Sequence, residues 1–136
     1  MADVHDKKTR SYNMSRIRGK DTKPELFVRK LCHSLGLRFR LYDKNLPGKP
    51  DLVFKRHITV VFVHGCFWHM HNCKYGKVVP KTNAAVWREK RLRTVERDKE
   101  NLKSIVGQGW RPVTIWECET KDISRLTKKL KTHFDL

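Results

Sequence analysis

The chain has 136 residues, enough for one domain with a single core, and its 31 Lys and Arg against 14 Asp and Glu give a formal net charge of +17. This charge favours a polyanionic partner, above all nucleic acid, over a membrane surface, which would call for a concentrated amphipathic helix. The absence of a membrane-length apolar stretch and of a signal peptide favours a cytosolic protein, in which four cysteines indicate metal binding or burial rather than disulfides.

The chain begins with a basic segment and continues into a helix. Residues 1–20 have no apolar period and are expected to form an arm that orders on a nucleic acid backbone, whereas residues 21–136 form one domain. Thr22-Lys23-Pro24-Glu25 has the form of a capping box and starts a helix that Gly36 ends. Apolar residues at spacings of three and four predict its buried stripe, namely Val28, Leu31, Cys32 and Leu35.

Three segments after this helix are predicted to be strands. Residues 37–42 alternate between apolar and polar side chains, as in a strand with one wet face. Residues 51–54 and 58–63 are separated by three polar residues and are expected to pair as an antiparallel hairpin. Since residues 58–63 are fully apolar, that strand is predicted to be central.

The second half of the chain alternates helix, strand and helix. A loop ends near Asn83, and a long helix then runs to Gly107 with an inward stripe of Leu92, Val95, Leu102, Ile105 and Val106. Residues 112–116 are expected to form a strand parallel to the preceding one, and a last helix buries Ile123, Leu126, Leu130 and Phe134. The order helix, three strands, helix, strand, helix predicts an α/β fold with a mixed central sheet flanked by helices.

Four metal-ligating residues follow two of the predicted strands. Cys66, His71 and Cys73 come after the central strand, and Cys118 comes after the last one. Thiolates and imidazole are the ligands of tetrahedral zinc, although this spacing is not that of a standard zinc finger, and plain burial of the cysteines is the alternative. A zinc ion with four protein ligands would be structural.

A second group of residues suits phosphodiester hydrolysis. Asp51, at the start of the hairpin, could hold a hard divalent cation beside a backbone carbonyl, although Pro-Asp pairs are also common in turns. His64 and His69 remain after zinc takes one imidazole, and either is a candidate general base or a satisfied histidine. Asp98, on the inward stripe of the long helix, needs a polar partner and could orient one imidazole. Glu25 has a competing role as the capping-box acid.

Aromatic residues stand beside the candidate zinc ligands. Phe67-Trp68 lie between Cys66 and His71, so a zinc-bound loop would hold them away from the core. Paired exposed aromatics suit stacking on bases or insertion between them, and Trp87 at the start of the long helix could join them. Packing of both rings against the zinc loop is the alternative.

Motifs along most of the chain resemble the bacterial very-short-patch repair endonucleases. The matching stretches are Met1–Arg10, Asn13-Met14, Asp21-Thr22, Glu25, Leu46-Pro47-Gly48, Pro50-Asp51, His64-Gly65-Cys66-Phe67-Trp68-His69, Trp87, Val95-Glu96-Arg97-Asp98 and Trp116-Glu117-Cys118. The resemblance implies a restriction-endonuclease-like core and a magnesium-dependent enzyme. Such an enzyme nicks duplex DNA just 5′ to the mispaired thymine of a T:G mismatch that arises when 5-methylcytosine deaminates.

The resemblance also implies residue roles. Asp51 and the backbone carbonyl of Val63 would hold Mg²⁺, and His69 would be the base that activates water. Glu25, His64 and Asp98 would support the catalytic site. The structural zinc would be bound by Cys66, His71, Cys73 and Cys118. The residues that enter the DNA would be Phe67, Trp68, Trp87 and, from the arm, Met14. The family often has a hydroxyl residue where this chain has Val63. The valine would be harmless if only the carbonyl binds metal, whereas a role for the hydroxyl would make this enzyme less active.

Two other functions remain open at this point. One is a nuclease with the same structural zinc but specificity for another mismatch or a modified base. The other is a non-catalytic zinc module that binds nucleic acid through charge and stacking. The partners that the resemblance implies are duplex DNA with a T:G mismatch, mismatch-repair proteins and a companion cytosine-5 methyltransferase, for a monomer in the bacterial cytoplasm that associates with the nucleoid.

Overall fold

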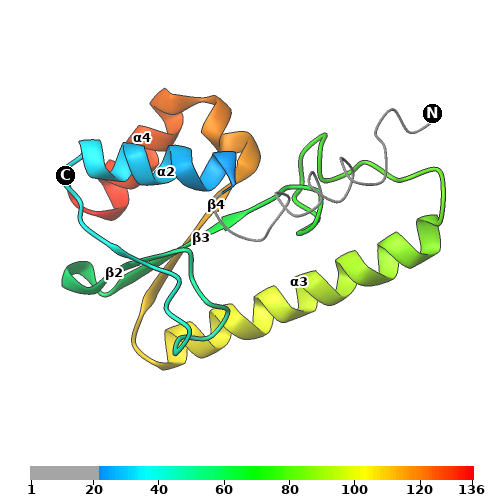
Figure 1. Cartoon of the computed structure of the whole chain (residues 1–136), viewed down its shortest axis with the longest axis horizontal. Helices are drawn as coiled ribbons and strands as arrows, with labels where there is room; N and C mark the ends of the chain where they lie inside the picture. Colours follow the sequence, from blue (N-terminus) through cyan, green and yellow to red (C-terminus); the bar gives the residue numbers. More distant parts are fainter. Residues whose placement is uncertain (1–21) are drawn as a thin grey trace, which may run out of the picture.

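The computed structural model describes residues 22–136, so the predicted arm at residues 1–20, with Met14, lies outside the described residues. The elements are α2 (Lys23–Ser34), β1 (Arg40–Leu41), β2 (Leu52–Phe54), the 3-10 helix η1 (Lys55–His57), β3 (Thr59–His64), α3 (Ala84–Gly107), β4 (Arg111–Trp116), the 3-10 helix η2 (Glu117–Lys121) and α4 (Ile123–His133). Figure 1 shows α2 and α4 on one face of the sheet and α3 on the other, extending past the sheet. Within the described residues, no helix is both long and apolar enough to cross a bilayer.

The four strands form one open sheet in the order β1-β2-β3-β4. β2 and β3 pair antiparallel, with Leu52 opposite Val61, which confirms the predicted hairpin. β3 and β4 pair in parallel, with Val61 opposite Val113, because α3 carries the chain back to the same end of the sheet. The prediction of a mixed sheet flanked by helices is therefore confirmed.

Several boundaries differ from the prediction. The strand expected over residues 37–42 is reduced to Arg40–Leu41, because Tyr42 has a left-handed backbone (φ 49°) that ends it. Ile58 was expected inside the central strand, but it is exposed and also left-handed (φ 50°), and it turns η1 into β3. Ile123, expected in the buried stripe of the last helix, is exposed in the first turn of α4.

Alternating side chains of β3 supply both sides of the core. Val61 packs with α2 and α4, whereas Val60 and Phe62 pack with Ile105 of α3. By the same alternation His64 follows Phe62 onto the α3 face, and the two rings are in contact. The strand thus delivers a histidine to the side of the sheet that α3 covers.

The buried face of α3 is more polar than the predicted stripe. Leu92 is 45% exposed and Val106 is also exposed, whereas Arg91 and Ile105 are buried. Arg91, Asp98 and Ile105 are spaced by seven residues and therefore share one face of the helix. The prediction was wrong for Leu92 because this half of α3 extends beyond the sheet and meets the polar loop after β3.

Candidate active site and metal cluster

A cavity of about 530 Å³ lies between the sheet and α3. It contains five of the residues that the sequence assigned to catalysis or magnesium binding: Asp51, Val63, His64, His69 and Asp98. Polar side chains from the segment before β2 and from α3 also line it: Tyr42, Lys44, Lys49, Thr94, Arg97 and Asn101. Residues from the segment before β2, from β3, from the loop after β3 and from α3 therefore meet in one pocket, in which three basic side chains outnumber two acidic ones.

Asp51 directly precedes β2 and is held beside β3. Its backbone N–H donates to the Val61 carbonyl (3.0 Å), and its carboxylate accepts the Val63 N–H (2.6 Å). Within one strand residue the N–H and C=O point to the same neighbour, so the Val63 carbonyl also faces Asp51. Burial raises the pKa of Asp51 to about 7, against the opposing hydrogen bond from Val63. A half-buried carboxylate beside a carbonyl fits a hard divalent cation, whose charge would offset the desolvation.

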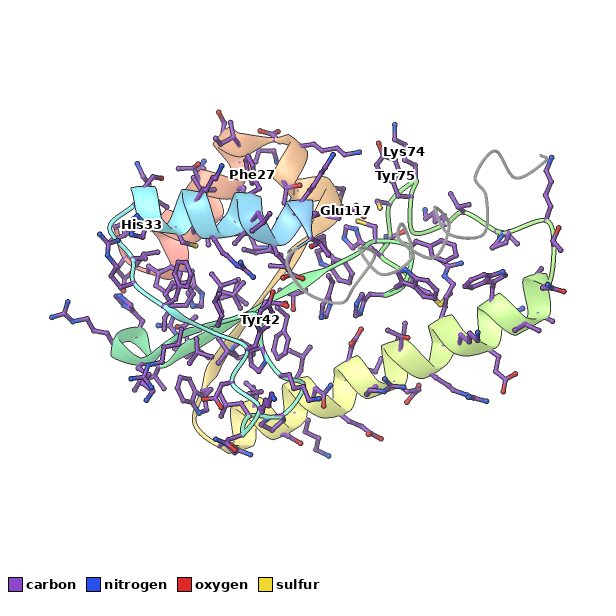
Figure 2. All side chains as sticks on the ribbon, in the orientation of Figure 1. Phe27, His33, Tyr42, Lys74, Tyr75 and Glu117 are labelled. Atoms are coloured by element: carbon purple, nitrogen blue, oxygen red, sulfur yellow. The ribbon has the colours of Figure 1, made fainter. Side chains whose placement is uncertain are left out.

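Glu25 lies near Asp51 and is tied to the cavity through Tyr42. The Glu25 N–H donates to the Thr22 hydroxyl (3.4 Å), which confirms Thr22 as the N-cap of α2. The buried Glu25 carboxylate accepts from the Tyr42 hydroxyl (2.5 Å), which in turn accepts from Arg29 (2.5 Å). Figure 2 shows Tyr42 between α2 and α3. The negative charge of Glu25 raises the pKa of Asp51, so the two carboxylates interact electrostatically.

His69 is paired with the carboxylate of α3. Its Nδ1 lies 2.5 Å from Asp98 Oδ2, so a proton on Nδ1 is donated to Asp98 and Nε2 is left as the basic atom. The His64 ring stacks on His69, with centroids 3.7 Å apart and planes parallel within 1°. Burial, followed by the neighbouring His69, lowers the pKa of His64 to about 4, which keeps His64 neutral near pH 7. The arrangement can orient one imidazole as a general base.

The same three residues also resemble a metal site by distance alone. The potential ligand atoms of His64, His69 and Asp98 lie within 4.8 Å of one another. However, imidazole binds metal in its ring plane, and an ion between two parallel rings 3.7 Å apart would lie about half that distance out of each plane. Base orientation is therefore the better interpretation of this cluster.

The four predicted zinc ligands come together at the end of the sheet. The Sγ atoms of Cys66, Cys73 and Cys118 and one ring nitrogen of His71 all lie within 4.8 Å of one another. His71 Nδ1 is 3.7 Å from Cys66 Sγ and 3.5 Å from Cys118 Sγ. Tetrahedral zinc, with bonds of about 2.3 Å to sulfur and about 2.0 Å to nitrogen, requires an edge of about 3.5 Å between such atoms. The donor set therefore fits zinc.

Backbone contacts support this cluster from two sides. The Cys118 N–H donates to Cys66 Sγ (3.3 Å), and the Gly76 N–H donates to Cys73 Sγ (3.4 Å). Trp116 stacks on the His71 ring, with centroids 4.1 Å apart. Donors to the sulfurs stabilise thiolates, and the stacked ring fixes the imidazole plane.

We expect Gly76→Ala to disrupt the cluster. A Cβ at residue 76 would lie 1.9 Å from the His71 carbonyl oxygen, a rigid backbone atom, so the loop has to move. The matched control is Gly107→Ala, where nothing lies within 4 Å and where the change should stabilise α3 by up to about 1 kcal/mol. Metal content and thermal unfolding measure both variants. A Gly76→Ala protein with the wild-type metal content and melting temperature would contradict the expectation.

Phe67, Trp68 and Trp87 form an aromatic cluster beside the cavity. The ring centroids are 5.4 Å apart for Phe67 and Trp68, 5.3 Å for Trp68 and Trp87, and 6.1 Å for Phe67 and Trp87. Trp68 is 46% exposed, while Phe67 and Trp87 are half-buried. The rings therefore pack on one another and still present an aromatic surface to solvent.

Sequence reasoning missed several residues of this region. Tyr42 and Lys49 line the cavity from positions with positive φ, which no sequence pattern indicated. Arg91 is buried under the aromatic cluster, and its spacing of seven residues before Asp98 could have placed it on the inward face of α3.

A half-buried carboxylate near an oriented imidazole, in a cationic cavity beside a partly exposed aromatic cluster, is typical of an enzyme that hydrolyses nucleic acid. A family model described as DNA mismatch endonuclease Vsr matches residues 2–75. The chain belongs to this family of DNA mismatch endonucleases, which confirms the resemblance in its motifs.

Relatives match over nearly the whole chain. The Type II nicking enzyme V.XorIIP of Xanthomonas oryzae pv. oryzae is 42% identical over 135 residues, which cover 99% of this chain and 98% of that protein. The DNA mismatch endonuclease Vsr of Escherichia coli (strain K12) is 44% identical over 132 residues, covering 97% and 84%. The Type II nicking enzyme V.NmeAIP of Neisseria meningitidis serogroup A is 40% identical over 138 residues, covering 96% and 98%.

Proposed function

We propose that this endonuclease nicks duplex DNA just 5′ to the mispaired thymine of a T:G mismatch that arises by deamination of 5-methylcytosine. The observation that carries the proposal is that Asp51 and the His69–Asp98 pair line one cavity, while the aromatic cluster is carried by the same loop as His69 and the same helix as Asp98. The core would be a variant of the restriction-endonuclease core, in which Phe62-Val63-His64 replace the usual carboxylate and lysine after the central strand.

Asp51 and the Val63 carbonyl would hold Mg²⁺, with Glu25 as a nearby carboxylate. The ion would neutralise charge on the scissile phosphate and on the attacking oxygen. The protein would hold the two metal-binding oxygens, of the Asp51 carboxylate and the Val63 carbonyl, at a fixed spacing through the hydrogen bonds between Asp51 and β3. A valine at residue 63 supplies the carbonyl as well as any other residue would.

His69 would remove the proton from the attacking water through Nε2. Asp98 holds the Nδ1 proton and would stabilise the imidazolium that results. His64, neutral and stacked on His69, packs against the base without adding a positive charge. Proton transfer and phosphate binding are thereby assigned to different side chains of one cavity.

The zinc cluster and the aromatic cluster would provide recognition. Zinc bound by Cys66, His71, Cys73 and Cys118 would hold the loop after β3, and Phe67, Trp68 and Trp87 would enter the DNA beside the mismatch. A mispaired step costs less to unstack than a Watson–Crick step, so insertion would favour mismatched DNA. The domain division at residue 20 and the contact by Met14 remain predictions for residues outside the described structure.

The expected partners follow from the same proposal. A net charge of +17 suits tight association with DNA, and we propose a monomer that acts on the bacterial nucleoid in the cytoplasm. Mismatch-repair proteins and a companion cytosine-5 methyltransferase would supply the functional context of the repair reaction.

We expect the wild-type protein, with Mg²⁺, to nick a T:G duplex much faster than T:A, C:G or other mismatched duplexes. His69→Ala should slow nicking by about 10²- to 10⁴-fold at unchanged DNA affinity, since it removes the general base. His33→Ala is the matched control, because His33 is exposed on α2 far from the cavity residues. Equal nicking of all duplexes would refute T:G specificity, and no magnesium-dependent nick at all would favour a binding module.

A further inference from the structure

Arg91 is a charged side chain in an unusual position. It is 4% exposed, and among residues 22–136 it forms no ion pair with a carboxylate. Its Nε donates to the Phe67 carbonyl (2.7 Å), its Nη1 donates to the Val78 carbonyl (2.9 Å), and its Nη2 donates to the Gly76 carbonyl. One guanidinium from α3 thus joins two separate stretches of the loop after β3.

The guanidinium also stacks on the residue whose carbonyl it binds. Its Cζ lies 4.2 Å from the centroid of the Phe67 ring, within the range of a cation–π contact. Phe67 is therefore held at its backbone and at its ring by the same planar group. Lysine cannot reproduce this, because a single ammonium lacks the fork that reaches three carbonyls and the flat surface that covers a ring.

Simple stabilisation is a poor explanation for this arrangement. Burying an unpaired guanidinium is costly, and apolar replacements of buried charges often stabilise a protein as well or better. What a planar donor group adds is directional control over the groups that it contacts. Here those groups are Phe67 and the loop segment at Gly76 and Val78.

Trp87 lies on the same face of α3 as Arg91, four residues earlier. Its ring centroid lies 6.1 Å from that of Phe67 and 5.3 Å from that of Trp68. Phe67 thus contacts both the guanidinium and the Trp87 ring, and Trp68 follows it in the chain. The geometry of the whole aromatic cluster depends on these two residues of one helix.

We propose that Arg91 is a positioning residue that fixes the aromatic cluster in its DNA-inserting arrangement before DNA binds. The proposal rests on the proposed function, because it assigns the cluster to insertion beside a mismatch. A preformed cluster avoids the entropy loss of ordering three large side chains during binding. Loss of Arg91 should therefore act on the affinity and selectivity for mismatched DNA more than on the chemical step.

The test uses Arg91→Lys and Arg91→Met in the full chain, with Arg93→Lys as the matched control. Arg93 is an exposed arginine on the same helix that pairs with Glu89. For the Arg91 variants we expect about one bound metal per chain, KM for the T:G duplex raised about 10- to 100-fold and kcat changed by only a few-fold. Without DNA, acrylamide should quench tryptophan fluorescence more strongly than in wild type. Arg93→Lys should match wild type in every measurement.

Three outcomes would overturn the proposal. They are an unchanged KM with unchanged quenching, a fall in kcat with no change in KM, and loss of metal or folding in both Arg91 variants, which would make Arg91 a determinant of the whole fold. Failure of the proposed function is distinguishable from these outcomes. In that case the wild-type protein would not nick T:G duplexes, whereas the quenching experiment needs no substrate and would still report on the cluster.

Discussion

Replacing Asp51 by Asn is expected to abolish magnesium-dependent nicking and, at the same time, to stabilise the protein in the absence of magnesium. Asparagine keeps the shape of the side chain and can still accept the Val63 N–H. It lacks the charge that a divalent cation needs, so activity should fall by at least about 10³-fold.

The stability effect follows from the pKa of Asp51. Burial raises it from 3.8 to about 7 in the folded protein, so the folded state binds this proton more tightly than the unfolded state does. Stability therefore declines as the pH rises from about 4 to about 7, and the full penalty is present above pH 7. Asparagine carries no such penalty. We expect Asp51→Asn to be more stable by about 1–3 kcal/mol at pH 8, with the difference vanishing near pH 4.

Urea unfolding without added magnesium, measured from pH 4 to pH 8, tests this expectation. Asp135→Asn is the matched control, since Asp135 is exposed and its left-handed backbone (φ 57°) also suits asparagine. A wild-type protein as stable as Asp51→Asn at pH 8 would show that Asp51 is not penalised by burial. An active Asp51→Asn enzyme would remove Asp51 from the metal site.

Replacing Cys118 by Ala is expected to release the zinc and to lower stability by several kcal/mol. Cys118 is the one candidate ligand that follows β4 rather than β3, so it closes the cluster across 45 residues of sequence from Cys73. A metal that binds only the folded arrangement would contribute its binding free energy directly to folding. The same variant should also reduce nicking, since the loop that carries Phe67 and Trp68 loses its anchor.

Cys32→Ala is the matched control for this experiment. Cys32 is equally a free cysteine, but it is buried in α2 among apolar side chains, away from the cluster. Its replacement should cost about 1–3 kcal/mol of packing while about one zinc per chain remains. Metal analysis and thermal unfolding of both variants test whether Cys118 is a zinc ligand. Full zinc retention in Cys118→Ala would refute the four-ligand site.

The sequence predicted well those features of the fold that depend on residues close together in the chain. The Thr22 cap, the left-handed Gly36 and the hairpin of β2 and β3 each depend on neighbouring residues, and all are present in the structure. The boundaries at Tyr42 and Ile58 were missed because both residues adopt positive φ, which β-branched and aromatic residues rarely do. Contacts with distant residues impose these positive φ values, so no local sequence pattern predicts them.

The sequence also identified a set of residues that the fold brings together, but it could not assign their partners. His69 and Asp98 are 29 positions apart, and only the path of α3 across the sheet places them 2.5 Å apart. The expectation that Leu92 faces inward rested on hydrophobicity alone. The structure places Arg91 there instead, because the neighbour of that turn is a row of loop carbonyls. Apolar periodicity predicts a buried face only where the covering surface is itself apolar.

The length of α3 has a consequence for the place of the cut. Trp87 and Asp98 belong to one unbroken helix and are eleven residues apart, which is about three turns and about 16 Å along the axis. They therefore leave the helix on nearly the same side, Trp87 toward Phe67 and Trp68 and Asp98 toward His69. In the proposed function, this helix would therefore fix the distance between the aromatic cluster that enters the DNA and the histidine that activates water. One residue inserted between Trp87 and Asp98 would rotate one side chain about 100° relative to the other around the helix axis. A whole inserted turn would keep their relative direction and lengthen the distance between them by about 5.4 Å.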